Sequence, residues 1–133
     1  MKIENIIPSD FSSKSAFTPA KKVDCGGYFM IYVSGTQPNK DAKTGKVLSN
    51  DIAEQTHQVF VEIDRTLNLA GASLDNVIKA TMYLTDLKDF SVVSPIRNEY
   101  FKKSRPVATT VEVNRLTRDG AKIEIEVTAL LEK

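Results

Sequence analysis

Two glutamates near the end of the chain are the side chains best suited to acid–base chemistry. Glu124 and Glu126 alternate with isoleucines in segment 121–131, so both lie on one side of a predicted strand. If that side faces water, they are two ordinary solvated carboxylates. If another molecule covers it, desolvation raises a carboxylate pKa toward neutrality, as a general acid or base requires. The spacing alone leaves both interpretations open.

Hydroxyl groups gather at two further places. Ser34, Gly35 and Thr36 end one predicted strand, whereas Thr109 and Thr110 lie within another. Hydroxyls and backbone N–H groups bind polar ligand atoms, but they occur in proteins of every function. These residues are therefore candidates for ligand binding and do not by themselves indicate a reaction.

The other reactive side chains predict neither a metal site nor a nucleophile. His57 is the only histidine, and it lies off the apolar face of a predicted helix, with no second histidine or cysteine at metal-ligand spacing. Cys25 is the only cysteine, and we expect a half-buried thiol without a neighbouring base. Since a lone cysteine forms no intrachain disulfide, a reducing cytoplasm is the expected setting.

The charged residues are nearly balanced, with eighteen Lys and Arg against seventeen Asp and Glu and a net charge of +1. Such a chain has no field that attracts nucleic acid or anionic lipid. Lys40, Lys43 and Lys46 gather in the polar segment 37–47, but no aromatic side chain there can stack on bases, so a solvated loop is favoured over RNA binding. The first eleven residues lack the apolar run of a signal peptide or membrane span. We expect neither a nucleic-acid nor a membrane partner.

The elements that position these residues follow from hydrophobic periodicity. Segment 51–70 predicts a helix because its apolar residues recur at three- and four-residue steps, with Ser49 or Asn50 as N-cap and Gly71 at its end. A second helix is expected near 92–101. Strands are predicted over 27–33, 77–85, 107–113 and 121–131.

This order of elements predicts one α+β domain, residues 1–133, with a mixed sheet. Right-handed crossovers place both helices on the same sheet face. The other face stays uncovered, although strand 27–33 is apolar on both sides. Association with other chains is the simplest way to bury it.

Seven short segments together resemble a known family. They are Val33-Ser34-Gly35, Ala70-Gly71-Ala72, Val77-Ile78-Lys79-Ala80-Thr81, Asp86-Leu87-Lys88-Asp89-Phe90, Asn98-Glu99-Tyr100-Phe101, Val111-Glu112-Val113-Asn114-Arg115-Leu116 and Lys122-Ile123-Glu124-Ile125-Glu126. Their order and separation resemble the reactive intermediate deaminase family (RidA/YjgF, also called endoribonuclease L-PSP). The match runs from Asp24 to Leu131 and is poor over 1–23.

The resemblance implies a chorismate-mutase-like α+β fold and a homotrimer whose sheets form a central barrel, with a small-molecule cleft at each subunit interface. It also implies hydrolysis of 2-imino acids or their enamine tautomers to 2-oxo acids and ammonia, without a cofactor. In the family an arginine binds the substrate carboxylate, since a guanidinium matches carboxylate geometry. A glutamate of the last strand handles water.

Carried over by position, the family pattern is incomplete in this chain. The glutamate falls on Glu124, the cleft backbone on Ser34 and Gly35, and a ligand-facing backbone position on Thr110. The arginine falls on Ala108, so the carboxylate contact is missing.

Other positions also depart from the family. Arg105 is not expected to replace the missing arginine, because residues three apart on a strand point to opposite faces. The usual glutamine after Ser-Gly is Thr36, and the usual asparagine of the second helix is Ser94. Phe17 is the candidate for an aromatic residue that precedes the first strand.

Three functions therefore stand side by side. The first is a RidA-like protein that binds a small metabolite between subunits and deaminates an enamine or imine of non-typical structure. The second is a non-catalytic ligand-sensing or protein-interaction trimer. A ribonuclease or translation inhibitor is the least favoured, because the net charge is close to zero and no basic stripe is present.

Overall fold

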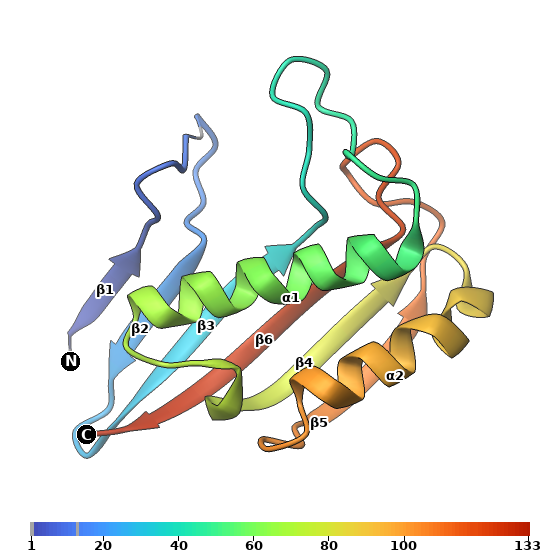
Figure 1. Ribbon diagram of the computed structural model, residues 1–133. Coiled ribbons are helices and arrows are strands. Elements are labelled where there is room, and N and C mark those ends of the chain that lie inside the picture. Colours follow the sequence, from blue (N-terminus) through green and yellow to red (C-terminus); the bar gives the residue numbers. More distant parts are fainter. Residues whose placement is uncertain (1, 13) are drawn as a thin grey trace.

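The chain folds as two helices against one six-stranded sheet in the computed structural model, which describes residues 2–12 and 14–133 (Figure 1). Two short 3₁₀ turns, Leu74–Asn76 and Leu87–Asp89, precede β4 and α2. The strands and helices are β1 (Ile3–Ile6), β2 (Ala20–Asp24), β3 (Tyr28–Thr36), α1 (Ile52–Leu69), β4 (Val77–Leu84), α2 (Phe90–Tyr100), β5 (Val107–Glu112) and β6 (Ile123–Glu132).

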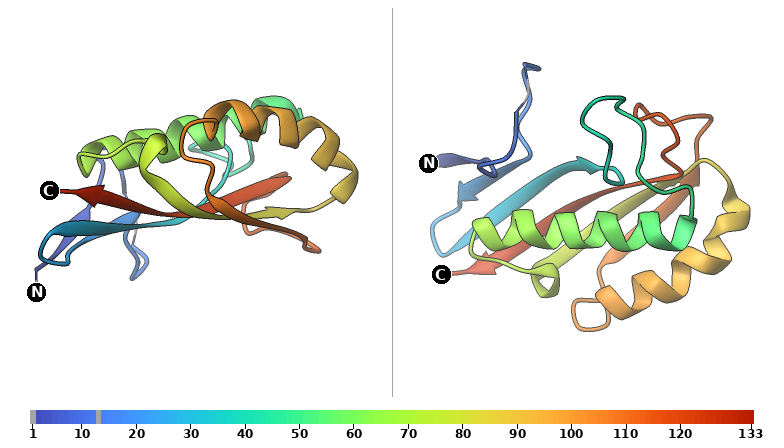
Figure 2. Two further views of the ribbon diagram at one scale, coloured as in Figure 1. Left: turned by 90° about the horizontal axis from the view of Figure 1, so that it is seen from below. Right: turned by 45° about the horizontal axis from the view of Figure 1, so that its top comes forward.

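The sheet is mixed, as predicted. Its strand order is β1-β2-β3-β6-β4-β5, and only β4 and β5 pair in parallel. Both helices lie on the same face, and no helix of the described residues covers the other face (Figure 2). The prediction of an α+β fold with one uncovered sheet face is confirmed.

Alternation along β6 divides the core from the uncovered face. Ile123, Ile125 and Val127 are almost fully buried under the helices, and Glu124 and Glu126 point the other way. The apolar face of α1 packs on the same core, where Val59, Phe60, Ile63 and Leu67 are fully buried. Burying a side chain of this kind contributes about 1.5–3 kcal/mol.

The termini of α1 are partly as predicted. Its N-cap is Asp51, whose carboxylate accepts from the Glu54 N–H, so the expected cap at Ser49 or Asn50 is wrong. Ser49 instead accepts from the Asp51 N–H and holds the cap in place. Gly71 follows the helix with φ 86°, a conformation that glycine adopts without strain.

The structure adds two strands before residue 27. β2 pairs with β3, and Ala20 is buried opposite Val33, whereas Lys21 and Lys22 follow it in the same short strand. A four- or five-residue strand with charged side chains gives almost no period-two signal. For this reason the sequence pattern missed both β1 and β2.

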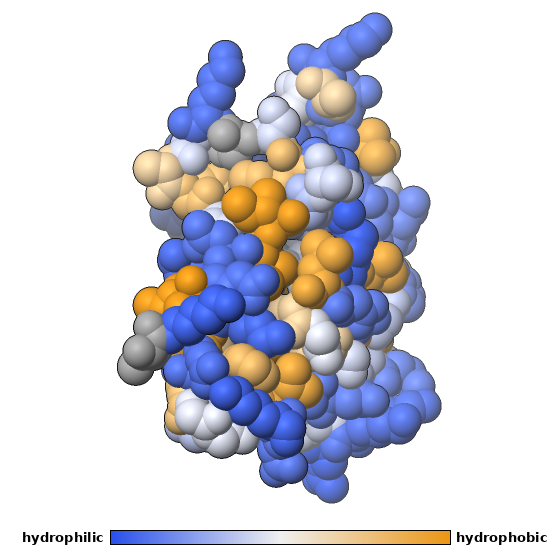
Figure 3. Space-filling model, turned by 90° about the vertical axis from the view of Figure 1, so that its left-hand side faces the viewer, coloured by the Kyte–Doolittle hydropathy of each residue, from blue (hydrophilic) through white to orange (hydrophobic). Residues whose placement is uncertain are grey.

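Apolar side chains remain exposed outside the helix layer. Tyr32 and Val107 are 50% and 70% exposed. Both lie on the uncovered sheet face, because Tyr32 pairs with Thr128, which alternates to the same side of β6 as Glu124 and Glu126, and Val107 pairs with Lys79, itself the partner of Thr128. Apolar groups also reach the surface beside β1, among hydrophilic ones (Figure 3), and Ile3 and Ile7 in this part of the chain are more than half exposed. The chain therefore presents more than one apolar surface for association.

Candidate functional site

Glu124 lies directly against the backbone of β3. The β3–β6 register shifts between Val33 and Thr36, and this irregularity carries Gly35 toward the glutamate. A Cβ added at Gly35 would overlap the Glu124 Oε2 atom and lie 2.9 Å from its Cδ. Residue 35 must therefore lack a side chain for the Glu124 carboxyl group to occupy its position.

The surroundings of Glu124 raise the pKa of its carboxyl group. Burial raises the pKa of this carboxyl above its ordinary value, and the negative charge of Glu126 raises it further. A side-chain hydrogen bond with Gln37 and the charge of Arg118 act in the opposite direction but do not cancel the effect. A carboxyl group with a raised pKa can both accept and donate a proton closer to neutral pH.

Glu126 has a different environment from Glu124, although both belong to the same face of β6. It is exposed, and it accepts a hydrogen bond of 2.5 Å from the Tyr83 hydroxyl. This bond raises the pKa of Tyr83. Of the two interpretations that the sequence left open, the solvated carboxylate applies to Glu126, and the general acid or base applies to Glu124.

Gln37 is a site residue that the sequence analysis missed. Its side chain opposes the rise in the Glu124 pKa, and its amide donates to the Thr117 hydroxyl at 2.6 Å and accepts from the Arg118 N–H at 3.0 Å. The Arg118 guanidinium in turn donates to the Pro38 carbonyl at 2.6 Å. The sequence contained a signal for this residue: the family has a glutamine directly after Ser-Gly, and in this chain Gln37 stands one position later, after Thr36.

The hydroxyls predicted near Gly35 are engaged within the chain. The Ser34 hydroxyl donates to the Thr18 carbonyl at 2.7 Å, and the Thr36 hydroxyl donates to the Ser34 carbonyl at 3.0 Å. Phe17 adjoins Thr18, the hydrogen-bond partner of Ser34, but it is 55% exposed and its ring packs in a T-shaped arrangement with the Phe11 ring. These residues fix the end of β3, and their hydroxyl oxygens stay available as acceptors.

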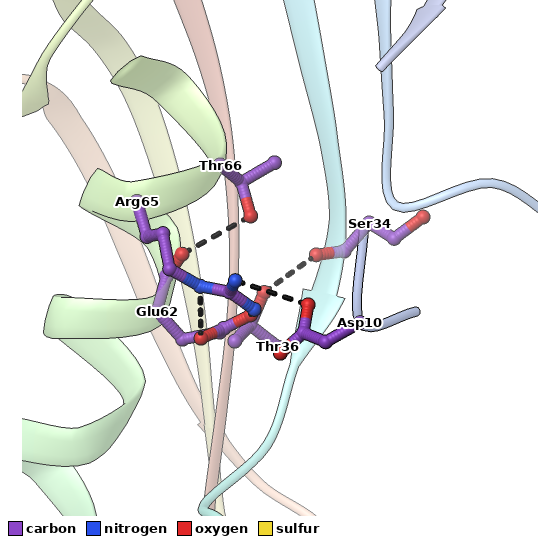
Figure 4. A network of polar contacts seen from close by, with 6 residues as sticks. All are labelled: Asp10, Ser34, Thr36, Glu62, Arg65 and Thr66. Carbon is purple, nitrogen blue, oxygen red and sulfur yellow. Dashed lines mark hydrogen bonds and ion pairs between the residues drawn. The ribbon is translucent and has the colours of Figure 1, made fainter. Parts of the chain in front are cut away.

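An ionic network ties the segment before β2 to α1. The Arg65 guanidinium donates to Glu62 at 2.7 Å and to Asp10 at 3.0 Å, beside Ser34 and Thr36 (Figure 4). The pairs are largely exposed, so each contributes little to stability. Their role is to hold the segment around Asp10 next to α1.

The remaining predicted residues form a second group, at the opposite edge of the sheet. Ala108 and Thr110 pair with the buried Ala80 and Met82 and therefore face the helix side of β5, whereas Thr109 faces the other side. Glu124 lies on β6, which is two strand positions and so roughly 10 Å from β5 at the usual strand spacing, and it points to the sheet face opposite Ala108 and Thr110. One chain therefore does not bring Ala108 or Thr110 to Glu124.

The prediction that Arg105 points away from Ala108 is wrong. Strand β5 begins at Val107, and Arg105 precedes it with a left-handed φ of 46°, so strand alternation does not extend to it. Arg105 and Ala108 line the same hollow, of about 670 Å³, together with Arg97 of α2. Arg97 also donates to the hydroxyl of Ser94 at 3.1 Å, which places Ser94 beside this second group.

The residues without a predicted role lie as expected. His57 is exposed, with its Nδ1 atom 2.8 Å from the Tyr100 hydroxyl, and the Cys25 thiol is half-buried. Lys40, Lys43 and Lys46 are exposed. In the described ranges 2–12 and 14–133 no three His, Cys, Asp or Glu side chains gather as metal ligands, and no helix there is long and apolar enough to cross a bilayer.

Substituting Gly35 by alanine is expected to displace the Glu124 carboxyl group. The new methyl group meets the far end of a flexible side chain, so the glutamate rotates into water and its pKa falls toward the ordinary value, while stability changes by less than about 1 kcal/mol. Carboxyl ¹³C NMR titration measures this shift. Gly27→Ala is the matched control because no atom lies within 4 Å of its added Cβ. An unchanged Glu124 titration in Gly35→Ala would contradict the contact.

Comparisons with known proteins agree on one family. Residues 13–131 match the family model described as Endoribonuclease L-PSP. A RutC family protein of Pyrococcus abyssi is 44% identical over 102 residues, which cover 77% of this chain and 79% of the relative. The 2-iminobutanoate/2-iminopropanoate deaminase of Homo sapiens is 36% identical over 100 residues, covering 75% and 72%. A Rid family protein of Yersinia pestis has a similar structure, with a TM-score of 0.81, 35% identity and coverage of 96% and 98%.

Proposed function

This chain belongs to the endoribonuclease L-PSP (RidA/YjgF) family, and from that premise we propose that it hydrolyses a small imine or enamine to a carbonyl compound and ammonia. The observation that carries the proposal is the position of Glu124, half-buried against Gly35 with a raised pKa. The 36% identity with a protein named 2-iminobutanoate/2-iminopropanoate deaminase supports the same reaction class.

In the proposed mechanism Glu124 acts as a general base on water. Its carboxylate takes a proton from a water molecule as the oxygen adds to the C=N carbon of the protonated imine, which gives a neutral carbinolamine. The protonated Glu124 then returns this proton to the amine nitrogen as the C–N bond breaks, and ammonia takes up the hydroxyl proton of the carbinolamine and leaves as ammonium. Water and imine are the only reactants and no oxidation state changes, so the reaction needs no redox cofactor.

We place the reaction between subunits of a homotrimer. In one chain Ala108 and Thr110 face the side of the sheet opposite Glu124, so a second copy is needed to bring these residues of β5 to Glu124. The exposed apolar residues of the uncovered face, Tyr32 and Val107, supply a surface for this association. In this assembly the backbone near Gly35 of one chain and Thr110 of the next would orient the ligand.

A non-catalytic ligand-binding trimer is the second candidate, and Ala108 is the observation that favours it. A cleft without the family's guanidinium at this position would still accept a metabolite but would bind a carboxylate with lower affinity. The two candidates differ in one measurable quantity, which is the rate of ammonia release.

The test of the proposed reaction uses imines made in situ by an amino-acid oxidase from a range of amino acids and amines. Ammonia release is compared with the spontaneous rate in the same mixture without the protein. Acceleration of at least one imine is expected. If the wild-type protein accelerates ammonia release from none of these imines, the deaminase hypothesis is rejected and the ligand-binding trimer is the remaining candidate.

The trimer is expected to depend on the uncovered sheet face. Wild-type protein should sediment as three chains of 14.7 kDa, and Val107→Asp should dissociate because it places a charge in the apolar contact. Val61→Asp is the matched control, since Val61 is 60% exposed on α1. Analytical ultracentrifugation at micromolar concentration measures the mass, and a wild-type monomer would contradict the shared cleft.

A further inference from the structure

A hollow at the edge of the sheet is lined by cationic side chains without any acidic one. It lies between the end of α2 and the start of β5, and its volume of about 670 Å³ is within the range of small-molecule sites. The lining residues are Arg97, Asn98, Phe101, Lys102, Arg105, Pro106 and Ala108. Neither the mechanism proposed for Glu124 nor the packing of the core explains this accumulation of positive charge.

Arg97 is held in the wall of this hollow by neutral partners only. Its guanidinium donates to the Ser94 hydroxyl at 3.1 Å and to the Asn98 side-chain oxygen at 3.1 and 3.2 Å, and it lies 5.4 Å from the centre of the Phe90 ring. Among the residues that the structure describes, no carboxylate forms an ion pair with it. A half-buried, pre-oriented guanidinium without a counter-ion is suited to an external anion.

The other two cations of the hollow differ in how they are held. Arg105 is exposed and adopts a left-handed φ of 46°, while its N–H donates to the Phe101 carbonyl at 2.8 Å. It too has no ion pair within the described part of the chain. Lys102 is paired with Glu99 at 3.5 Å, an exposed contact of small energy.

The end of α2 neutralises only part of this charge. A helix C-terminus carries roughly half a negative elementary charge, which attracts cations such as Arg97 and is the simplest reason for one of them to be there. The two unpaired guanidinium groups carry two positive charges, which is more than the partial negative charge of the helix end can neutralise. An excess of positive charge therefore remains inside the hollow.

We propose that this hollow binds the carboxylate of a small metabolite, with Arg97 and Arg105 as its ligands. The inference rests on the proposed function, for which it assigns the side chains of this chain that would bind an anionic substrate. The methyl group of Ala108 leaves the space beside the two guanidiniums open. Arg97 lies on α2, in the wall of the same hollow, and its guanidinium supplies the positive charge that Ala108 lacks.

The test measures binding of 2-oxobutanoate and of its uncharged methyl ester to the full-length protein by ¹H–¹⁵N NMR titration. The acid is expected to shift backbone signals within 94–108 and to bind more tightly than the ester. Arg97→Gln should weaken binding of the acid roughly ten- to a hundredfold, as expected for losing hydrogen bonds to a charged group, and should leave ester binding unchanged. Arg105→Gly is a second, independent variant, because glycine accepts the left-handed φ.

Lys103→Gln is the matched control for net charge. Lys103 neighbours Lys102 in the sequence, does not line the hollow and faces Asp75 at 3.8 Å. Equal affinity of 2-oxobutanoate for wild type and Arg97→Gln, or an equal loss in Lys103→Gln, would overturn the anion site. Binding is measured without turnover, so the two proposals fail separately. Arg97-dependent binding without ammonia release rejects only the reaction, and ammonia release with Arg97-independent binding rejects only this site.

Discussion

Glu124→Gln is expected to lower the protein-dependent rate of ammonia release by roughly 10²–10⁴-fold, the usual contribution of a general base. The amide keeps the size of the side chain beside Gly35 but cannot accept a proton from water. Initial rates at saturating imine, with thermal unfolding as a check of the fold, measure the effect. Retention of more than about a tenth of the rate would exclude Glu124 as the base.

Glu126→Gln is the matched control for this substitution. Glu126 lies two residues away on the same face and binds the Tyr83 hydroxyl, so it is not expected to contact the imine. Its negative charge raises the pKa of Glu124, and the variant should therefore lower that pKa while keeping activity.

The pH profile separates these two glutamates. Glu124 acts as a base only when deprotonated, so activity should fall as the pH drops through its raised pKa, at a higher pH than for an exposed glutamate. Glu126→Gln should move this fall to lower pH. A profile that is identical in wild type and Glu126→Gln would contradict the coupling between the two carboxylates.

Ala108→Arg is expected to raise kcat/KM for 2-imino acids roughly ten- to a hundredfold, because a buried charged contact typically contributes about 2–5 kcal/mol and Ala108 is exposed in the single chain. The new side chain begins on the helix-side face of β5, in the wall of the hollow that Arg97 lines. The gain should be larger in an Arg97→Gln background, where no other guanidinium lies on α2 beside the hollow. Steady-state kinetics with imines made in situ give the values.

Thr109→Arg provides the control for Ala108→Arg. It adds the same charge one residue further on, but its side chain starts from the opposite face of β5. No gain is expected there. If wild type lacks activity and only Ala108→Arg has it, the natural protein is the ligand-binding trimer with an intact cleft.

Sequence periodicity determined most of the fold. The apolar steps of α1 and the alternation along β6 each depend on residues close in the chain, so the buried face of each element was correctly predicted, including the separation of Glu124 from Ile123 and Ile125. Crossover handedness then placed both helices on one side. The short strands β1 and β2 were not predicted, because they contain too few residues to show a periodicity of two.

Tertiary structure alone decided which residues meet. The register shift in β3 presses Gly35 against Glu124 and brings Gln37 to the same carboxyl group, contacts between distant parts of the chain that no local pattern specifies. Likewise the left-handed φ of Arg105 takes it out of strand alternation and into the hollow of Ala108. The physical reason is that periodicity records which face of an element is buried, whereas a site depends on irregular backbone and on packing between elements.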